Sequence, residues 1–282
     1  GVRPGDQVGL YLPRSIAMYV SLLAILKSGG AYVVLDDSYP PERVREICRR
    51  ASLRHAISTR SLGDALEASC WTGRLCLDAP EVEAALSGYG ENDLGLALEE
   101  GSAAFAYFTS GSTGAPKGAL NSHAGAVNAM QAMARELGLG PGDRVLQFAP
   151  VGFDVVIEEV LPAWFSGAAV VLRDEEGVLV PARLQEMLAR NGITVCELMP
   201  SYWAHWVAYL GREHMAPPES LRCVMLGSDQ VRVEIYRMWQ DFGIPIVNVF
   251  GLTETGCTST VYRAEGPQPY EKTLPNGRPL AN

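Results

Sequence analysis

Short apolar runs alternate with helix-periodic segments along most of this chain of 282 residues. Residues 15–27 carry apolar side chains at helical spacing, and residues 31–35 follow as an apolar run of strand length. Strands that are apolar throughout are usually buried on both faces, and parallel strands need crossover segments that are usually helices. The pattern therefore predicts an α/β fold in which parallel sheets are covered by helices on both faces.

The alternation falls into two blocks that meet at a turn near residues 141–143. We expect a first α/β lobe over residues 1–138 and a second α/β lobe over residues 139–262. Residues 60–101 are less regular and richer in Gly, Ser and acidic residues, which indicates surface excursions. The strands expected after residue 140 lie near 144–149, 168–172, 193–198, 221–226 and 246–250, with helices at 154–166, 181–190, 201–210 and 231–242.

Composition excludes several classes of partner. The net charge of −9 argues against a nucleic-acid binder, because phosphate backbones attract basic faces. No apolar run reaches the ~18 residues that a membrane span needs, so we expect neither a nucleic-acid nor a membrane partner. The cysteines show neither CxxC nor zinc-like spacing, which predicts buried, unpaired thiols in a reducing cytoplasm. These residues are Cys48, Cys70, Cys76, Cys196, Cys223 and Cys257.

A segment rich in glycine and hydroxyl residues, 109–118, follows the strand expected at 103–109. Small residues let backbone N–H groups approach an anion, hydroxyls add donors, and Lys117 supplies a point charge. Its order excludes a Walker A loop, since Lys117 precedes Gly118, and it is not a GxGxxG turn. We expect a loop that holds the phosphates of ATP; a flexible surface loop is the alternative. The expected phosphate contacts are Thr109, Ser110, Gly111, Ser112, Thr113, Gly114 and Lys117.

Four segments, in order, resemble the adenylation domains of nonribosomal peptide synthetases, within the adenylate-forming superfamily. Residues 105–118, FAYFTSGSTGAPKG, resemble the phosphate-loop motif, and residues 26–36, LKSGGAYVVLD, resemble an earlier LKAGxAYVPLD motif. Phe153 and Asp154 fall where those domains carry FD, and residues 248–254, NVFGLTE, resemble NxYGPTE. These segments are distributed over residues 26–254, which is most of the chain.

The resemblance implies both a reaction and a fold. In such domains a carboxylate attacks the α-phosphorus of Mg·ATP to give an acyl-adenylate and pyrophosphate. The phosphopantetheine thiol of a carrier protein, next to neighbouring synthetase domains, then takes the acyl group. The implied fold is the N-terminal core of two doubly wound α/β lobes, with residues 263–282 as the start of a β-barrel segment. The family's C-terminal lobe, which brings a lysine to the α-phosphate, lies beyond this chain, so we expect these residues alone to adenylate poorly.

Catalytic roles carry over by motif position. Ser110, Thr113 and Lys117 would hold the β- and γ-phosphates, Thr253 would donate to the α-phosphate, and Glu254 would coordinate Mg²⁺. We therefore expect Lys117, Thr253 and Glu254 to form the catalytic set, with ATP and Mg²⁺ as cofactors.

Nucleotide contacts carry over in the same way. Phe250 occupies the position of the aromatic residue that stacks on adenine, but it lacks the usual hydroxyl, and Leu252 replaces the usual proline. The remaining nucleotide positions are Gly227, Ser228, Asn248 and Gly251.

Asp154 matches the acid that pairs with the α-amino group of an amino-acid substrate. Fatty-acid and aryl-acid substrates have no ammonium group, so this residue favours amino-acid activation. The alternative is an ordinary helix N-terminal aspartate that interacts with the helix dipole.

The substrate pocket can be located by offset from these motifs. Glu197 lies inside an otherwise apolar strand, and two acids facing one pocket repel each other unless a cation lies between them. We therefore expect a cationic substrate side chain, such as that of ornithine, arginine or lysine. The alternative is a shifted register, with Glu158 in solvent beside Glu159 and Glu197 bonded to a hydroxyl or amide group. The expected pocket residues are Asp154, Val155, Glu158, Glu197, Met225, Gly227, Val249, Cys257 and Thr258.

Two other functions remain open. A stand-alone acyl- or aryl-CoA ligase of the same superfamily would share the phosphate loop, but it would have no use for Asp154. A non-catalytic scaffold with an adenylation-like core would need neither the phosphate contact of Lys117 nor the magnesium contact of Glu254.

Overall fold

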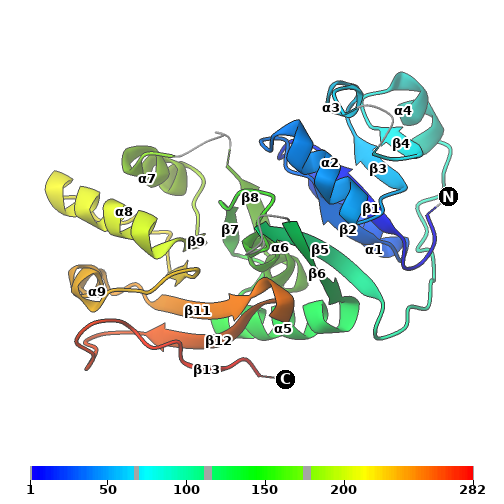
Figure 1. Cartoon of the computed structure of the whole chain (residues 1–282). Coiled ribbons are helices and arrows are strands. Elements are labelled where there is room, and N and C mark those ends of the chain that lie inside the picture. Colours follow the sequence, from blue (N-terminus) through cyan, green and yellow to red (C-terminus); the bar gives the residue numbers. More distant parts are fainter. Residues whose placement is uncertain (1, 67–69, 111–115, 174–178, 282) are drawn as a thin grey trace. The chain divides into compact units, whose positions relative to one another are not determined.

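The computed structural model describes residues 2–66, 70–110, 116–173 and 179–281 (Figure 1). Its internal contacts divide the chain into two compact units. The first contains residues 1–126 and 150–153, and the second contains residues 127–149 and 154–282. Each unit is described by itself.

The first unit is built on a six-stranded sheet of order β4-β3-β1-β2-β5-β6, in which only β6 is antiparallel to its neighbour. The chain moves from β1 to β2 through α1, then back past β1 to β3 through α2. Because such crossovers are right-handed, α1 and α2 cover opposite faces, which makes the sheet doubly wound. Its elements are β1 (Gln7–Tyr11), α1 (Ile16–Lys27), β2 (Ala31–Val34), α2 (Pro41–Arg50), β3 (His55–Ser58), α3 (Arg60–Asp64), β4 (Gly73–Cys76), α4 (Pro80–Leu86), β5 (Ala103–Ser110) and β6 (Pro116–Ser122).

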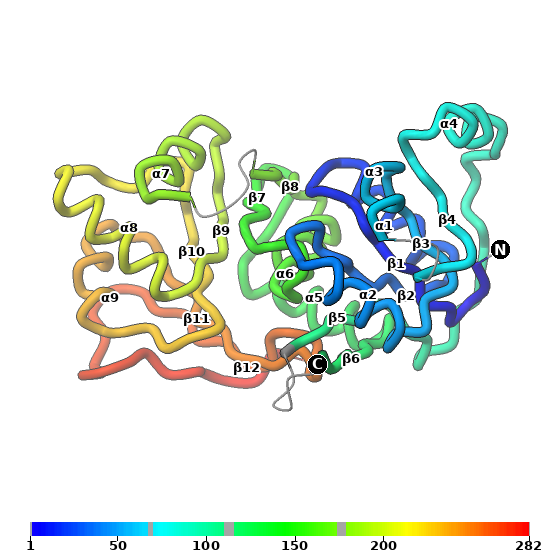
Figure 2. Tube along the Cα trace, turned by 45° about the horizontal axis from the view of Figure 1, so that its top comes forward, coloured from blue at the N-terminus to red at the C-terminus, as the bar shows by residue number. Residues whose placement is uncertain are grey.

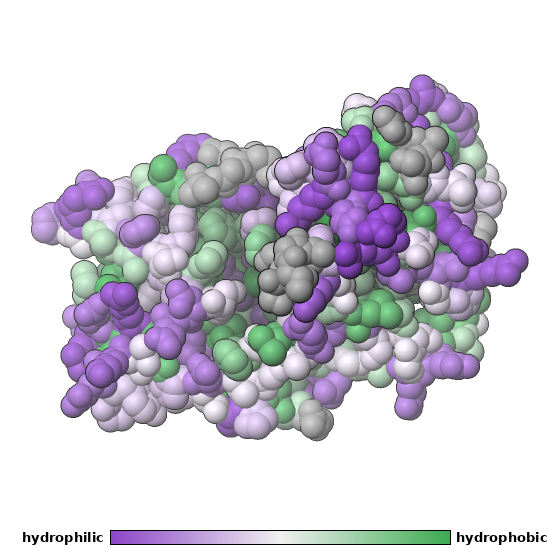
Figure 3. Space-filling model, viewed as in Figure 1, coloured by the Kyte–Doolittle hydropathy of each residue, from purple (hydrophilic) through white to green (hydrophobic). Residues whose placement is uncertain are grey.

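The ends of α1 and α2 follow from local chemistry. Ser15 precedes α1, and its hydroxyl accepts a hydrogen bond from the Met18 backbone N–H at 3.2 Å. Proline begins α2, where its missing N–H costs nothing. The inner face of α2 packs Val44 and Ile47 into the core, and hydrophilic residues gather over α2 on the surface (Figure 3).

The second unit is built on a seven-stranded sheet of order β13-β12-β11-β10-β9-β7-β8, parallel from β8 to β11. The chain steps from β7 outward to β8 through α6, then back to β9, β10 and β11 through α7, α8 and α9. Right-handed crossovers therefore place α6 on one face and the other three helices on the opposite face. Figure 2 shows α7, α8 and α9 grouped together.

The remaining helices and strands belong to the second unit, except that α5 begins in the first unit. They are α5 (His123–Leu137), β7 (Arg144–Gln147), α6 (Val155–Phe165), β8 (Ala169–Leu172), α7 (Pro181–Arg190), β9 (Val195–Leu198), α8 (Pro200–Glu213), β10 (Cys223–Leu226), α9 (Val233–Trp239), η1 (Gln240–Phe242), β11 (Ile246–Leu252), η2 (Thr253–Thr255), β12 (Cys257–Ala264) and β13 (Arg278–Pro279).

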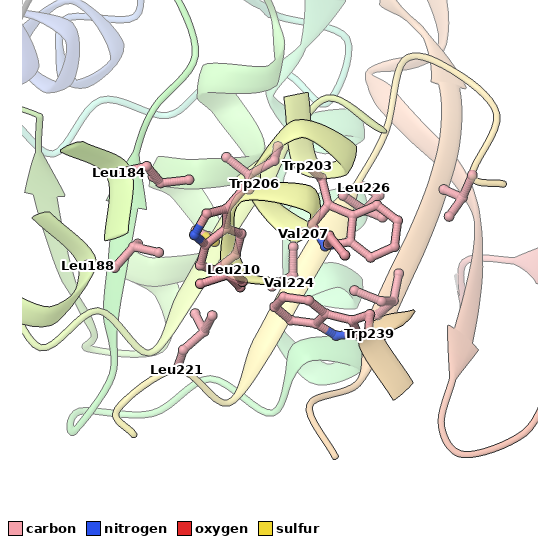
Figure 4. Packing of buried hydrophobic residues seen from close by; sticks show 14 of the residues in the cluster. Leu184, Leu188, Trp203, Trp206, Val207, Leu210, Leu221, Val224, Leu226 and Trp239 are labelled. Atoms are coloured by element: carbon pink, nitrogen blue, oxygen red, sulfur yellow. The ribbon is translucent and has the colours of Figure 1, made fainter. Parts of the chain in front are cut away.

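Three tryptophans form the centre of the core under α8 and α9 (Figure 4). The ring centroids of Trp206 and Trp239 lie 5.3 Å apart, and those of Trp203 and Trp239 lie 5.8 Å apart. The Trp206 Nε1–H donates to Gln185 Oε1 at 3.1 Å, which satisfies the indole donor inside the core. Aromatic area of this size supplies much of the hydrophobic stabilisation of the unit.

The predicted α/β architecture is confirmed, with specific differences. Residues 60–101 contain α3, β4 and α4 rather than only surface excursions. Residues 109–110 and 116–118 of the expected phosphate loop belong to the antiparallel strands β5 and β6. Strand β6 is mostly polar and lies at a sheet edge, so it lacks the apolar run by which buried strands are predicted.

The contact-defined units divide inside α5, between Ala126 and Val127, whereas the sequence division places that whole helix in the first lobe. The end of α5 is held by tertiary contacts that sequence periodicity does not reveal. Arg222 donates to the Leu137 carbonyl oxygen at 2.9 Å, and Arg278 pairs with Glu136 at 2.7 Å. The barrel assignment of residues 263–282 stays a prediction; the structure places β13 at the edge of the second sheet.

No helix in the described part of the chain is long and apolar enough to cross a membrane.

Candidate functional site

The second sheet has a switch point where the chain changes direction, between β7 and β9. Open α/β sheets bind ligands beside the carboxyl ends of the strands at such points. Asp154 precedes α6 just after the β7 end of this edge, and its side chain makes no capping hydrogen bond. Glu158 lies one helical turn further on, on the same side of α6.

Alternation along the strands brings Glu197 to the face that α6 covers. Its neighbours Cys196 and Leu198 pack in the tryptophan core on the opposite face of the sheet. Successive side chains of a strand point to opposite faces, so Glu197 points toward α6. Met225 pairs with Glu197 in register across β9 and β10 and therefore shares this face.

The two glutamates are buried, and no described residue forms an ion pair with either of them. Glu158 is 2% exposed and Glu197 is 5% exposed. Among the residues that the structure describes, no hydrogen-bond donor reaches Glu158 Oε1 or Glu197 Oε2. The alternative of a solvent-exposed Glu158 is thus wrong, because Glu158 is buried. Among the described residues, no hydroxyl or amide group reaches Glu197 Oε2.

Burial changes the titration of both glutamates. Desolvation raises the pKa of Glu158 to about 7; hydrogen bonding from the Thr258 and Cys257 side chains opposes this rise, and the charge of Asp154 adds to it. Desolvation, followed by the charges of Glu158, Glu159 and Asp154, raises the pKa of Glu197 well above its usual range. No cation contributes to either shift.

Glu159, in the same helix, is a buried acid whose two carboxylate oxygens both accept hydrogen bonds. Its Oε1 accepts backbone N–H groups of Phe148 and Ala149, each at 2.9 Å, and its Oε2 accepts from Gln147 Nε2 at 2.7 Å. Glu159 therefore ties α6 to the end of β7 and positions the turn that carries Asp154 and Glu158. Sequence reasoning gave it no such role, because nothing in an adjacent pair of glutamates says which one faces the strand.

The rest of the expected pocket lies around the two acids. A Cβ added at Gly227 would lie 2.8 Å from Val249 Cγ2 and 3.2 Å from Glu197 Oε1, so a side chain here would crowd both Val249 and the Glu197 carboxylate. Thr258 is buried, and Cys257 is half-buried with a left-handed φ of 78°. Val155 is half-buried in the first turn of α6. The structure thus brings Asp154, Glu158, Glu197, Gly227 and Val249 together with the start of β12.

The close approach of β11 and β12 depends on one glycine. A Cβ at Gly251 would lie 1.6 Å from the Cys257 carbonyl oxygen, at a register shift between Phe250 and Gly251. No side chain fits between the backbone of Gly251 and that of Cys257. The register shift lies where β11 meets the start of β12, which carries the expected pocket residues Cys257 and Thr258.

The expected phosphate contacts belong to the first unit. Thr109 and Lys117 are cross-strand partners in the β5–β6 hairpin, and the Lys117 side chain is exposed. Gly111, Ser112, Thr113 and Gly114 lie outside the described residues, as does the side chain of Ser110.

The other nucleotide and metal positions belong to the second unit. Thr253 and Glu254 begin η2; Thr253 is half-buried, and the exposed Glu254 carboxylate has no partner among the described side chains. The Phe250 ring is 50% exposed, and Ser228 is exposed with a left-handed φ of 70°.

The side-chain amide of Asn248 already makes a hydrogen bond within the protein. It is buried, and its Nδ2 donates to the Pro275 carbonyl oxygen at 2.8 Å.

The metal-ligating side chains and thiols of the described residues form no further candidate site. Within the described ranges, no group of three or more His, Cys, Asp or Glu side chains is placed to hold a metal ion. All six cysteines are free, as expected, and only Cys257 is not fully buried.

The whole chain matches a known enzyme family. The model of the family described as AMP-binding enzyme matches residues 1–282. Tyrocidine synthase 3 of Brevibacillus parabrevis is 32% identical over 286 aligned residues, which cover 100% of this chain and 4% of that protein. The chain therefore spans only a small part of this relative.

Two solved structures resemble the fold. The N-terminal subdomain of NpsA from Klebsiella oxytoca, in complex with 3-hydroxybenzoyl-AMSN, aligns with a TM-score of 0.80 and 23% identity, over 99% of this chain and 68% of that chain. The AMPPNP-bound form of the nonribosomal peptide synthetase FmoA3 aligns with a TM-score of 0.88 and 25% identity, over 100% of this chain and 30% of that chain.

Proposed function

This chain belongs to the AMP-binding enzyme family, and from that premise we propose that it activates an amino acid with a cationic side chain as its aminoacyl-adenylate. ATP supplies the adenylyl group, and pyrophosphate leaves. The substrates in view are ornithine, lysine and arginine. The observation that carries the proposal is that the buried carboxyl groups of Glu158 and Glu197 each have one oxygen without a hydrogen-bond partner among the described residues.

A cation would complement the charge of this pocket. Buried carboxylates are costly unless they are paired, and each of these has an oxygen with no partner. A substrate ammonium or guanidinium group between Glu158 and Glu197 would satisfy both oxygens and cancel their repulsion. Asp154 has a side chain free of capping bonds and would hold the α-ammonium group.

The nucleotide residues support adenylation as the reaction. Lys117 is exposed, so its ammonium group can bind the β- and γ-phosphates. Thr253 would donate to the α-phosphate, where negative charge grows as the carboxylate attacks. When bound, Mg²⁺ would neutralise phosphate charge, and the free Glu254 carboxylate fits the single protein ligand that such an ion commonly takes. Phe250 is half exposed, so its side chain is accessible to adenine.

We propose the phosphopantetheine thiol of a carrier protein as acceptor of the aminoacyl group, with neighbouring synthetase domains as further partners. The support is the similarity to tyrocidine synthase 3 over the whole chain.

Pyrophosphate exchange tests the proposal. Substrate-dependent exchange of labelled pyrophosphate into ATP is measured in the full-length protein with ornithine, lysine, arginine, leucine, phenylalanine and anthranilate. We expect one of the three cationic amino acids to give the highest rate, and we expect Glu197→Gln to reduce that preference at least tenfold. Glu213→Gln changes an exposed acid of α8 and serves as the matched control. A clear preference for an uncharged amino acid would overturn the cationic proposal.

Aryl-acid activation is the second candidate, because the similar NpsA structure carries a 3-hydroxybenzoyl ligand. An aryl acid has no ammonium group for Asp154 and no cation for Glu158. Exchange driven best by anthranilate would therefore favour this candidate, whereas absence of both exchange and nucleotide binding would favour a non-catalytic scaffold.

A further inference from the structure

We propose that binding of the cationic substrate side chain expels a proton from the Glu158–Glu197 pair. The proposal rests on the proposed function, since it concerns the same pocket and needs a cationic substrate. It adds that the empty pocket is not a fixed pair of negative charges; a proton occupies the place that the substrate cation later takes.

The described groups that face the pair are acidic, weakly polar or apolar. Helix α6 contributes Asp154 and Glu159, and β12 contributes the Cys257 thiol and the Thr258 hydroxyl. Strands β10 and β11 contribute the apolar side chains of Met225 and Val249. Every charge acting on the pair is therefore negative, and no described lysine or arginine contributes to the shift of either glutamate.

Ionising both acids of the pair is costly. Two desolvated carboxyl groups that share a site do not both ionise at neutral pH, because desolvation and mutual repulsion disfavour the second charge. Glu159 cannot relieve this repulsion. Its oxygens are occupied by Gln147, Phe148 and Ala149, and its own charge adds to the field at Glu197.

A bound cation reverses this preference for the protonated pair. Its positive charge stabilises the doubly ionised pair, so the pKa of the protonated carboxyl group falls. The O–H bond of that group breaks, its electron pair stays on the carboxylate oxygen, and the proton passes to the solvent. The cation then bonds to the oxygen that had carried the proton, and no other reactant is needed.

The affinity for the cationic substrate side chain should therefore depend on pH. While the pair is protonated, binding that releases one proton strengthens tenfold for each unit of pH. A neutral side chain of the same shape gains nothing from deprotonation, so its affinity should stay flat or fall as pH rises.

Calorimetry on the full-length protein tests the proposal. The ligands are sulfamoyl-adenosine analogues of the aminoacyl-adenylate. The ornithyl analogue is compared with the norvalyl analogue, which lacks only the terminal amine; if exchange selects lysine, the lysyl and norleucyl analogues are used, and if it selects arginine, the arginyl and norleucyl analogues are used. Heats measured at pH 7 in phosphate and in Tris, buffers of different ionisation enthalpy, give the number of protons released. Subtracting the neutral analogue removes protons exchanged at the α-amine.

We expect the cationic analogue to release close to one proton more than the neutral analogue, and to bind about tenfold more weakly at pH 6 than at pH 7. Glu197→Gln should reduce the extra release to less than half a proton, and Glu213→Gln should leave it unchanged. The wild-type buffer comparison stands even if the Glu197 variant does not fold.

Two failures are distinguishable. Tight binding of the cationic analogue with no extra proton release would overturn this inference and leave the proposed substrate class standing. Tighter binding of the neutral analogue at every pH would overturn both.

Discussion

Arg222 holds both carboxylate oxygens of Asp143, with Nε 2.7 Å from Oδ1 and Nη2 2.8 Å from Oδ2. The same carboxylate accepts from the Thr194 hydroxyl at 2.7 Å and from the Gly140 backbone N–H at 2.9 Å. Arg222 also donates to the carbonyl oxygens of Leu137 and Gly138. This ion pair and its hydrogen bonds therefore join the end of α5 to the residues that immediately precede the parallel strands β7, β9 and β10.

Asp143→Asn should destabilise the protein in a pH-dependent way. Hydrogen bonding from Arg222, opposed by burial, lowers the pKa of Asp143 from 3.8 to about 2. The contribution is present above pH 3.8 and is lost as pH falls through 2. Because Arg222 is partly exposed, we expect a loss of about 1–2 kcal/mol at pH 7. Urea denaturation at pH 7 and pH 2 measures it. The exposed Asp241 provides the control, and an equal loss in Asp241→Asn would contradict the prediction.

Gly251→Ala should disrupt the start of β12. The added methyl group would lie 1.6 Å from the Cys257 carbonyl oxygen, so backbone must move. We expect a loss of more than ~2 kcal/mol in the free energy of unfolding. Gly211→Ala is the matched control: its Cβ meets nothing within 4 Å, and alanine favours the helix by roughly 0.5–1 kcal/mol. Chemical denaturation of the two variants should move in opposite directions.

The empty pocket should make the protein less stable as pH rises. The pKa of Glu158 rises from 4.5 to about 7 on folding, so its favourable contribution is present below pH 4.5 and is lost as pH rises through 7. Glu197 shifts in the same direction. We expect Glu197→Gln to raise the free energy of unfolding by about 1–3 kcal/mol at pH 8 and to change it little at pH 4.5. Thermal unfolding across this range checks the sign; a variant that is less stable at pH 8 would contradict it.

Trp206→Ala should cost ~3–5 kcal/mol, because the side chain is fully buried. Trp206→Phe keeps an aromatic ring but leaves Gln185 Oε1 without its donor, for a smaller loss of about 1–3 kcal/mol. Phe165 is 45% exposed, so Phe165→Ala should cost much less than either. Guanidinium denaturation curves would rank the three variants.

Sequence patterns predicted the elements whose signals are local. The helix over residues 181–190 has the predicted bounds, because an initial proline marks its start. Strands β6 and β12 were missed because both are antiparallel and mix polar with apolar residues. Their pairing is a tertiary property that no window of sequence contains.

The candidate site was likewise predictable from the sequence only in part. The burial of Glu197 could be predicted from its apolar strand, but the register that sets it beside Met225 could not. Glu158 and Glu159 look equivalent in the sequence. A step of one residue turns a helix by ~100°, and that rotation leaves Glu158 without a partner for Oε1 while Glu159 receives three donors.

The tryptophan core also makes the chain an optical reporter. Four of the five tryptophans, Trp164, Trp203, Trp206 and Trp239, belong to the second unit, and only Trp71 belongs to the first. Intrinsic fluorescence therefore follows mainly the unit that carries the acid pocket, whereas far-ultraviolet circular dichroism follows both. Coincident transitions would mean that the units unfold together; separate ones would let the stability of each be read without a label.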